Sequence, residues 1–129
     1  MRCEIADEIS ASQLHSRLKQ ENPPLLIDVR EPEELAIVRL SGGVSVPMAT
    51  LLSRWDSLVA QAAESKSEIV LYCRSGCRTD YILSQLIELG LAHQSKKQGG
   101  ETAPAVSVTH LAGGILGWVR DVDPSLPTY

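Results

Sequence analysis

The chain has 129 residues, 43% of them hydrophobic, and a formal net charge of -4. That length allows one domain with a buried core, residues 1–129, and excludes two. The acidic balance gives no basic field for nucleic acid or for an anionic membrane surface, so we expect neither as a partner. Its three cysteines lack framework spacing and no apolar run approaches a membrane span, which favours a soluble, cytoplasmic protein.

The first predicted elements are a helix and a buried strand. Ser10, followed three residues later by Gln13, is a capping box that predicts a helix start, and Asn22-Pro23-Pro24 ends that helix. Residues 25–29 read Leu-Leu-Ile-Asp-Val, a mainly apolar run without alternation. Such a run is typical of a parallel strand that is buried on both faces.

Charged residues follow at the end of this strand. Asp28 and Arg30 lie where open parallel sheets place their ligand crevice. Charged side chains at strand ends also commonly form a structural ion pair or brace a loop, and both interpretations stay open. Pro32 and the glutamates after it suit the first turn of a short helix.

The middle of the chain predicts more of the core. A glycine turn leads into a short strand at residues 44–46. The next apolar side chains recur at helical spacing and should pack on the core: Leu51, Leu52, Trp55, Leu58, Val59 and Ala62.

The last third combines a polar segment with a final strand and helix. Residues 93–105 are polar and predict a mobile loop, and residues 106–111 are the last strand candidate. Gly113-Gly114 then permits a tight turn into a helix that carries Trp118. The residues expected in the core are Leu26, Ile27, Val29, Val44, Val46, Ile69, Val70, Leu71, Leu86 and Trp118.

The most informative stretch runs from residue 69 to residue 90. Four apolar residues predict a buried strand, a helical pattern follows, and the loop between them holds Cys73, Arg74 and Arg78. The loop is small and polar, so its backbone N–H groups can surround whatever the sulfur carries. The helix N-terminus, these amides and the two guanidiniums all favour a thiolate. We therefore predict a nucleophile in an anion-binding cradle, in place of the inert buried thiol that is usual for an unpaired cysteine.

Three motifs resemble those of rhodanese-like sulfurtransferases. They are the loop Cys73-Arg74-Ser75-Gly76-Cys77-Arg78-Thr79, the run Asp28-x-Arg30-x-x-x-Glu34 and the ending Gly113-Gly114-x-x-x-Trp118. The resemblance implies an α/β rhodanese-like fold, with a central, mainly parallel five-stranded sheet and helices on both faces. It also implies that Cys73 carries a persulfide and needs no cofactor. The loop residues that would bind the substrate are Arg74, Ser75, Gly76, Cys77, Arg78 and Thr79, supported by Asp28 and Arg30.

The resemblance also implies an activity and partners. The activity would be transfer of sulfane sulfur from a donor such as thiosulfate or a protein persulfide. The tail at residues 121–129 is similar to the end of the rhodanese domain in adenylyltransferase–sulfurtransferase proteins, which implies a ubiquitin-like sulfur carrier as acceptor. For Cys77 two interpretations stay open: a small loop residue, or a thiol that resolves the persulfide by forming a disulfide with Cys73.

Two other functions are compatible with the same fold class. Phosphatases and arsenate reductases that look similar have five residues between the cysteine and an arginine, whereas here four separate Cys73 from Arg78 and Thr79 takes the arginine's place. A noncatalytic binding module is the second alternative, but such modules commonly lack the cysteine. The histidines are isolated in sequence, so we expect no metal site and treat them as surface or packing residues: His15, His93 and His110.

Overall fold

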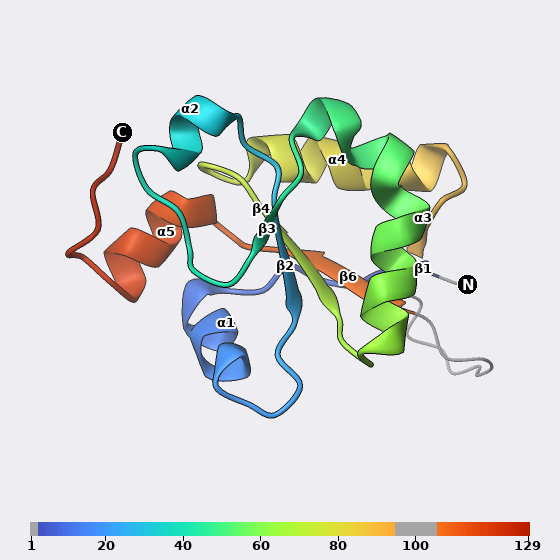
Figure 1. Ribbon diagram of the computed structural model, residues 1–129, viewed down its shortest axis with the longest axis horizontal. Helices are drawn as coiled ribbons and strands as arrows, with labels where there is room; N and C mark the ends of the chain where they lie inside the picture. Colours follow the sequence, from blue (N-terminus) through green and yellow to red (C-terminus); the bar gives the residue numbers. More distant parts are fainter. Residues whose placement is uncertain (1–2, 95–105) are drawn as a thin grey trace.

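The computed structural model describes residues 3–94 and 106–129, which fold around a six-stranded sheet (Figure 1). The strands are β1 (Cys3–Ile5), β2 (Leu25–Asp28), β3 (Val44–Ser45), β4 (Ile69–Tyr72), β5 (His93–Gln94) and β6 (Val106–His110). The helices are α1 (Ala11–Leu18), α2 (Pro32–Leu35), α3 (Met48–Glu64), α4 (Cys77–Glu88) and α5 (Gly114–Asp121).

The strands are parallel throughout and lie in the order β3-β2-β4-β6-β1-β5. Asp28 of β2 is in register with Tyr72 of β4, and Leu71 of β4 with His110 of β6. The carboxyl ends of these three strands therefore meet at one edge of the sheet, where α/β proteins place their ligand sites.

Alternate residues of the central strands face opposite layers of helices, because side chains of a strand point to its two faces in turn. Ile69 and Leu71 pack in one core cluster with side chains of α3 and α4. Val70 and Tyr72 pack in a second cluster with side chains of α1 and α5. Figure 1 shows these two pairs of helices on opposite sides of the sheet.

The expected α/β architecture is confirmed, but the sheet has six strands where we predicted five. The sequence pattern located four of these six strands, and the two that it missed lie at one edge: β1 has three residues and β5 has two. Runs this short carry no readable period. His93–Gln94 was also predicted to begin a mobile loop and instead pairs with β1, whereas residues 95–105 of that loop lie outside the described residues.

Most of the predicted core is buried. Nine of the ten expected residues are, and Val44 is half-buried against the same cluster. The stripe on α3 is buried except at Leu52, which is 42% exposed, because this residue lies at the border of the helix's apolar face. Ser10 and Gln13 form the predicted capping box at the start of α1. Within the described residues, none of the helices has both the length and the apolar character needed to cross a membrane.

Candidate active site

Cys73 lies at the carboxyl edge of the sheet, directly after β4. The four residues of β4 are all buried, and α4 begins four residues beyond the cysteine at Cys77. Between them Gly76 has a φ of 107°, a conformation that favours glycine, and its N–H donates to Cys73 Sγ at 3.1 Å. Cys73 itself is 1% exposed. The sulfur is therefore enclosed by its own loop and points toward the N-terminus of α4, where a negative charge is favoured.

The first turn of α5 is hydrogen-bonded to the backbone of this loop. The N–H groups of Ile115 and Leu116 donate to the carbonyl oxygens of Cys73 and Arg74, at 2.9 and 3.1 Å. Gly114 makes the approach possible, because a Cβ there would overlap both carbonyl groups. These two hydrogen bonds hold the first two peptide groups of the loop against α5. The predicted double-glycine turn thus sets the shape of the Cys73 loop.

Thr79 connects the sulfur to a histidine. Its side chain is fully buried, with Oγ1 donating to the Gly76 carbonyl oxygen at 3.1 Å and lying 3.7 Å from Cys73 Sγ. The same oxygen is 2.8 Å from His110 Nδ1, and Nε2 of that ring is 3.6 Å from the Glu8 carboxylate. We had expected His110 to be a surface or packing residue. Its position as the last residue of a parallel strand was the signal that could have placed it here.

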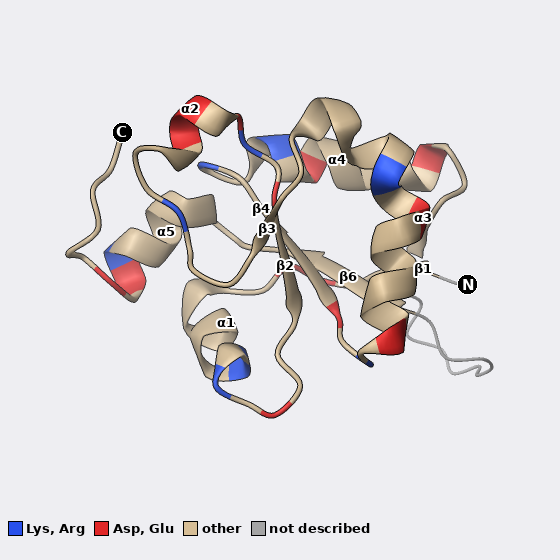
Figure 2. Ribbon diagram, viewed as in Figure 1, with Lys and Arg blue, Asp and Glu red and all other residues tan. Residues whose placement is uncertain are grey.

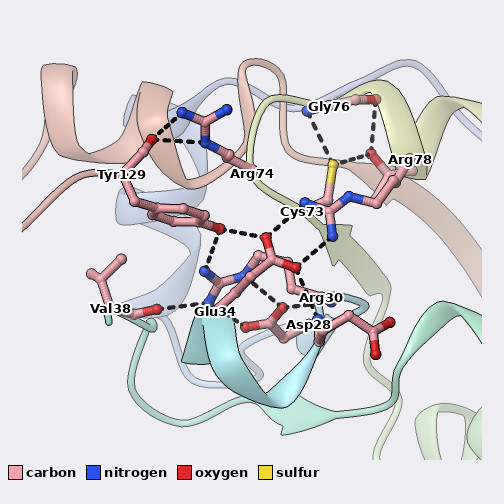
Figure 3. Close-up of polar contacts among 11 residues, drawn as sticks. Asp28, Arg30, Glu34, Val38, Cys73, Arg74, Gly76, Arg78 and Tyr129 are labelled. Carbon is pink, nitrogen blue, oxygen red and sulfur yellow. Dashed lines mark hydrogen bonds and ion pairs between the residues drawn. The ribbon is translucent and has the colours of Figure 1, made fainter. Parts of the chain in front are cut away.

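Arg78 forms an ion pair with Glu34 of α2 (Figure 3). Its two terminal nitrogens donate to the two carboxylate oxygens at 2.7 and 2.8 Å. These hydrogen bonds lower the pKa of Glu34 to about 2 and raise the pKa of Arg78. The nearby Cys73 also raises the pKa of Arg78, by a smaller amount. Figure 2 shows the acidic residues of α2 at the same end of the molecule as the basic start of α4.

Arg74 contacts the tail of the chain. Its guanidinium donates from Nε and Nη2 to the main-chain oxygen of Tyr129, the former at 2.8 Å, and its Cζ lies 4.9 Å from the centre of that ring (Figure 3). The Tyr129 hydroxyl donates to Glu34 at 2.8 Å. Both arginines of the loop therefore donate to acceptors of the protein itself, Arg74 to Tyr129 and Arg78 to Glu34. The sequence analysis gave Tyr129 no role at the site.

Asp28 and Arg30 form an ion pair next to this network, which is the structural one of the two interpretations. Arg30 is 0% exposed and donates to both Asp28 oxygens, from Nε at 2.9 Å and from Nη2 at 2.7 Å. Its remaining hydrogen bonds go to the carbonyl of Val38 at 2.8 Å and the hydroxyl of Tyr129 at 2.9 Å. The pair joins β2, the segment after α2 and the tail of the chain.

The family model of the rhodanese-like domain matches residues 10–121. This chain belongs to the rhodanese-like domain family. The chain is 29% identical to the adenylyltransferase and sulfurtransferase uba4 of Pyricularia oryzae over 94% of its own length and 26% of that protein. It is 32% identical to the adenylyltransferase and sulfurtransferase MOCS3 of Drosophila ananassae, over 85% of its length and 22% of that protein. The chain thus spans about a quarter of the curated relatives it matches.

The fold of this rhodanese-like domain also matches solved structures. A rhodanese-related protein from Thermoplasma volcanium superposes with a TM-score of 0.64 at 21% identity, over 95% of this chain and 96% of that one. At this identity the likeness supports the fold alone. The chemistry of the domain depends on the residues of its Cys73 loop.

The other side chains of the rhodanese-like loop are exposed. Ser75 and Cys77 are both on the surface, and the Ser75 hydroxyl lies 3.8 Å from the Cys77 sulfur as a weak donor. All three cysteines are free thiols, and burial raises the pKa of Cys3, the first residue of β1, to about 11. In the described part of the chain, no three His, Cys, Asp or Glu side chains converge as metal ligands. Both interpretations of Cys77 stay predictions.

Proposed function

We propose that this rhodanese-like domain is a sulfurtransferase in which Cys73 carries the transferred sulfur. The observation that carries the proposal is the hydrogen bond from the Gly76 N–H to Cys73 Sγ, at the N-terminus of α4. An amide donor and a helix N-terminus both stabilise negative charge, on a thiolate or on the outer sulfur of a persulfide. The relatives, which are named as sulfurtransferases, support the same reaction class.

The first half-reaction loads the cysteine. The Cys73 thiolate attacks the outer sulfur of thiosulfate, a sulfur–sulfur bond forms, and sulfite leaves with the electron pair of the bond that breaks. A protein persulfide can replace thiosulfate, with its own thiolate as leaving group. Because Cys73 is 1% exposed, the loop has to open before a donor can reach Sγ.

The second half-reaction unloads it. An acceptor nucleophile attacks the outer sulfur, and the Cys73 thiolate leaves with the bonding electrons. We propose a ubiquitin-like sulfur carrier as the physiological acceptor. The outer persulfide sulfur then attacks the activated carboxyl-terminal acyl group of the carrier, and the activating group leaves, which gives an acyl disulfide on Cys73. A thiol reductant attacks the Cys73 sulfur of this disulfide, the carrier leaves as a thiocarboxylate, and a second thiol restores the Cys73 thiolate from the mixed disulfide. This proposal draws on the names of the relatives, of which the chain covers about a quarter. Arg74 and Arg78 would then attract the anionic donor or the carboxyl end of the carrier.

A steady-state assay of sulfur transfer from thiosulfate to cyanide tests the reaction class. We expect Cys73→Ala to abolish turnover with the fold intact, and Cys77→Ser, as the matched control, to retain it. Retained activity in Cys73→Ala would overturn the assignment. An aryl phosphate serves as the competing substrate: its hydrolysis by Cys73 would instead favour the phosphatase alternative, which the four-residue spacing to Arg78 disfavours.

A further inference from the structure

We propose that His110, together with Glu8, is a positioning residue that directs the hydroxyl proton of Thr79 onto the sulfur of Cys73. The inference rests on the proposed function, in which Cys73 has to act as a thiolate. Neither residue touches the sulfur. Both act through Thr79, which does.

The Thr79 hydroxyl has a single proton and three neighbours. The Gly76 carbonyl oxygen, at 3.1 Å, can only accept. His110 Nδ1 is 2.8 Å away and can accept or donate according to where the ring carries its proton. Cys73 Sγ, at 3.7 Å, accepts when it is a thiolate. Because Thr79 is 0% exposed, solvent cannot reorient this hydroxyl, and its neighbours decide where the proton goes.

The state of the histidine ring therefore sets the direction of the hydroxyl. If Nδ1 carries no proton, it accepts from Thr79 at the shortest of the three distances, and the sulfur loses a donor. If Nδ1 carries a proton, it donates to Oγ1, which frees the hydroxyl proton for Cys73 or Gly76. A thiolate is the stronger acceptor of those two, because hydrogen bonds to an ionised group are the stronger ones.

Glu8 lies at the other nitrogen of the ring, with its carboxylate 3.6 Å from Nε2. When the ring carries a proton on both nitrogens, Nε2–H faces this carboxylate and Nδ1–H faces the Thr79 oxygen, which is the donating state. The His110 side chain is 12% exposed, so the ring is largely enclosed by protein. The Glu8 side chain is 58% exposed, so water can solvate its carboxylate and no further hydrogen-bond donor from the protein is required. The charged groups at this relay are thus Glu8 and, at its other end, the thiolate with Arg78.

Backbone pairing fixes the relay in place. The Ile9 N–H donates to the His110 carbonyl oxygen at 3.0 Å, and the Ala112 N–H donates to the Ile9 carbonyl oxygen at 2.8 Å. The Leu111 N–H donates to Leu71 of β4 at 2.9 Å. The segment before α1, the end of β6 and the end of β4 are therefore bound side by side, which brings Glu8, His110 and Cys73 to the same edge of the sheet.

The test is the pH dependence of Cys73 alkylation by iodoacetamide, followed by peptide mass spectrometry in a Cys77→Ser background. In His110→Leu we expect alkylation at pH 6 to slow about tenfold, and the half-plateau of the profile to move up by about one pH unit, since one hydrogen bond to a charged group is lost. Thr79→Val should give the same shift, Thr79→Ser should restore the profile, and Glu8→Gln should shift it less in the same direction. The double variant His110→Leu/Thr79→Val should show no further shift, because both substitutions break one relay.

The control is a second histidine–glutamate pair. His93 Nε2 lies 4.0 Å from Glu4 at the exposed edge of the sheet, and neither residue contacts the loop in the described structure. We expect His93→Leu to leave the alkylation profile unchanged. If His110→Leu does not fold, two milder variants test the relay: Glu8→Gln, and His110→Asn, which keeps an amide near the position of Nδ1. The relay would be overturned if the alkylation profile is unshifted in Glu8→Gln and alkylation is slowed in His110→Asn.

The outcomes separate this inference from the proposed function. A folded His110→Leu protein whose profile superposes on that of the parent would overturn the relay, whether or not the domain transfers sulfur. Additive shifts in the double variant would also overturn it. A shifted profile in a domain whose Cys73 never takes up sulfur would support the relay and overturn the proposed function alone.

Discussion

The guanidinium of Arg78 and the carboxylate of Glu34 meet through two parallel hydrogen bonds of 2.7 and 2.8 Å. The residues come from the first turn of α4 and from α2, and their contact joins the Cys73 loop to the segment after β2. The geometry of the pair is the two-point fit that arginine and carboxylate groups form best. This ion pair should influence the stability of the domain at acid pH, through Glu34, and the attraction of an anionic sulfur donor, through Arg78.

Substitution of Glu34 should change the acid stability of the domain. Because folding lowers the pKa of Glu34 from 4.5 to about 2, its ionised form stabilises the fold above pH 4.5, and this contribution is lost as the pH falls toward 2. The free energy of unfolding in urea should therefore be lower for Glu34→Gln than for the parent at pH 7, and the difference should shrink between pH 4.5 and 2. Glu33→Gln, on the exposed face of α2, is the control. A difference that stays constant across this range would contradict the assignment.

Substitution of Arg78 should impair donor use more than stability. We expect Arg78→Ala to lower kcat/KM for thiosulfate about tenfold, because it removes a positive charge next to the reacting sulfur. The loss of a partly exposed ion pair should cost only about 1 kcal/mol in the free energy of unfolding. Steady-state kinetics over a range of thiosulfate concentrations measures the first quantity. Arg54→Ala, on the exposed face of α3, should behave like the parent, and an Arg78→Ala protein with unchanged dependence on thiosulfate would exclude the proposed role.

A methyl group at Gly114 should disrupt the loop. Gly114 has a φ of 60°, and a Cβ there would overlap the carbonyl groups of Cys73 and Arg74. Gly90 has a φ of 73° with no atom near its Cβ position, so it isolates the conformational cost. Denaturant unfolding should give a loss of about 1 kcal/mol for Gly90→Ala and at least about 3 kcal/mol for Gly114→Ala. Equal losses in the two variants would mean that the contact with the loop contributes nothing.

Loss of one partner of the buried ion pair should be costly. Asp28→Asn leaves the guanidinium of Arg30 enclosed without a counter-charge, and we expect the free energy of unfolding to fall by about 3–5 kcal/mol. The pair of Arg17 and Glu68 provides the comparison, because its side chains are 29% and 25% exposed. Glu68→Gln should cost less than about 1 kcal/mol. Similar losses in the two variants would show that the Asp28 carboxylate is not needed as a counter-charge.

Local sequence signals predicted the centre of this fold. The apolar runs of β2 and β4, the capping box at Ser10 and the double glycine at residues 113–114 each encode their structure within a few neighbouring residues. These elements also placed Cys73 and its loop correctly. The buried pair of Asp28 and Arg30 was among the interpretations considered.

The features missed by sequence reasoning depend on long-range register. The contact between Thr79 and His110 forms only because β6 pairs beside β4, and 31 positions separate the two residues. Likewise, Tyr129 reaches Arg30 and Arg74 across 99 and 55 positions. The edge strands β1 and β5 are too short to show a period. Local patterns cannot specify such contacts, because they arise from how the elements are packed together.

The most direct test of the central claim is the intact mass of the protein after incubation with thiosulfate. We predict that the parent gains one sulfur atom, that cyanide removes it, and that Cys77→Ser gains it in the same way. Peptide mapping should place the added sulfur on Cys73. A protein that gains no mass, or a Cys73→Ala variant that gains as much sulfur as the parent, would contradict the account.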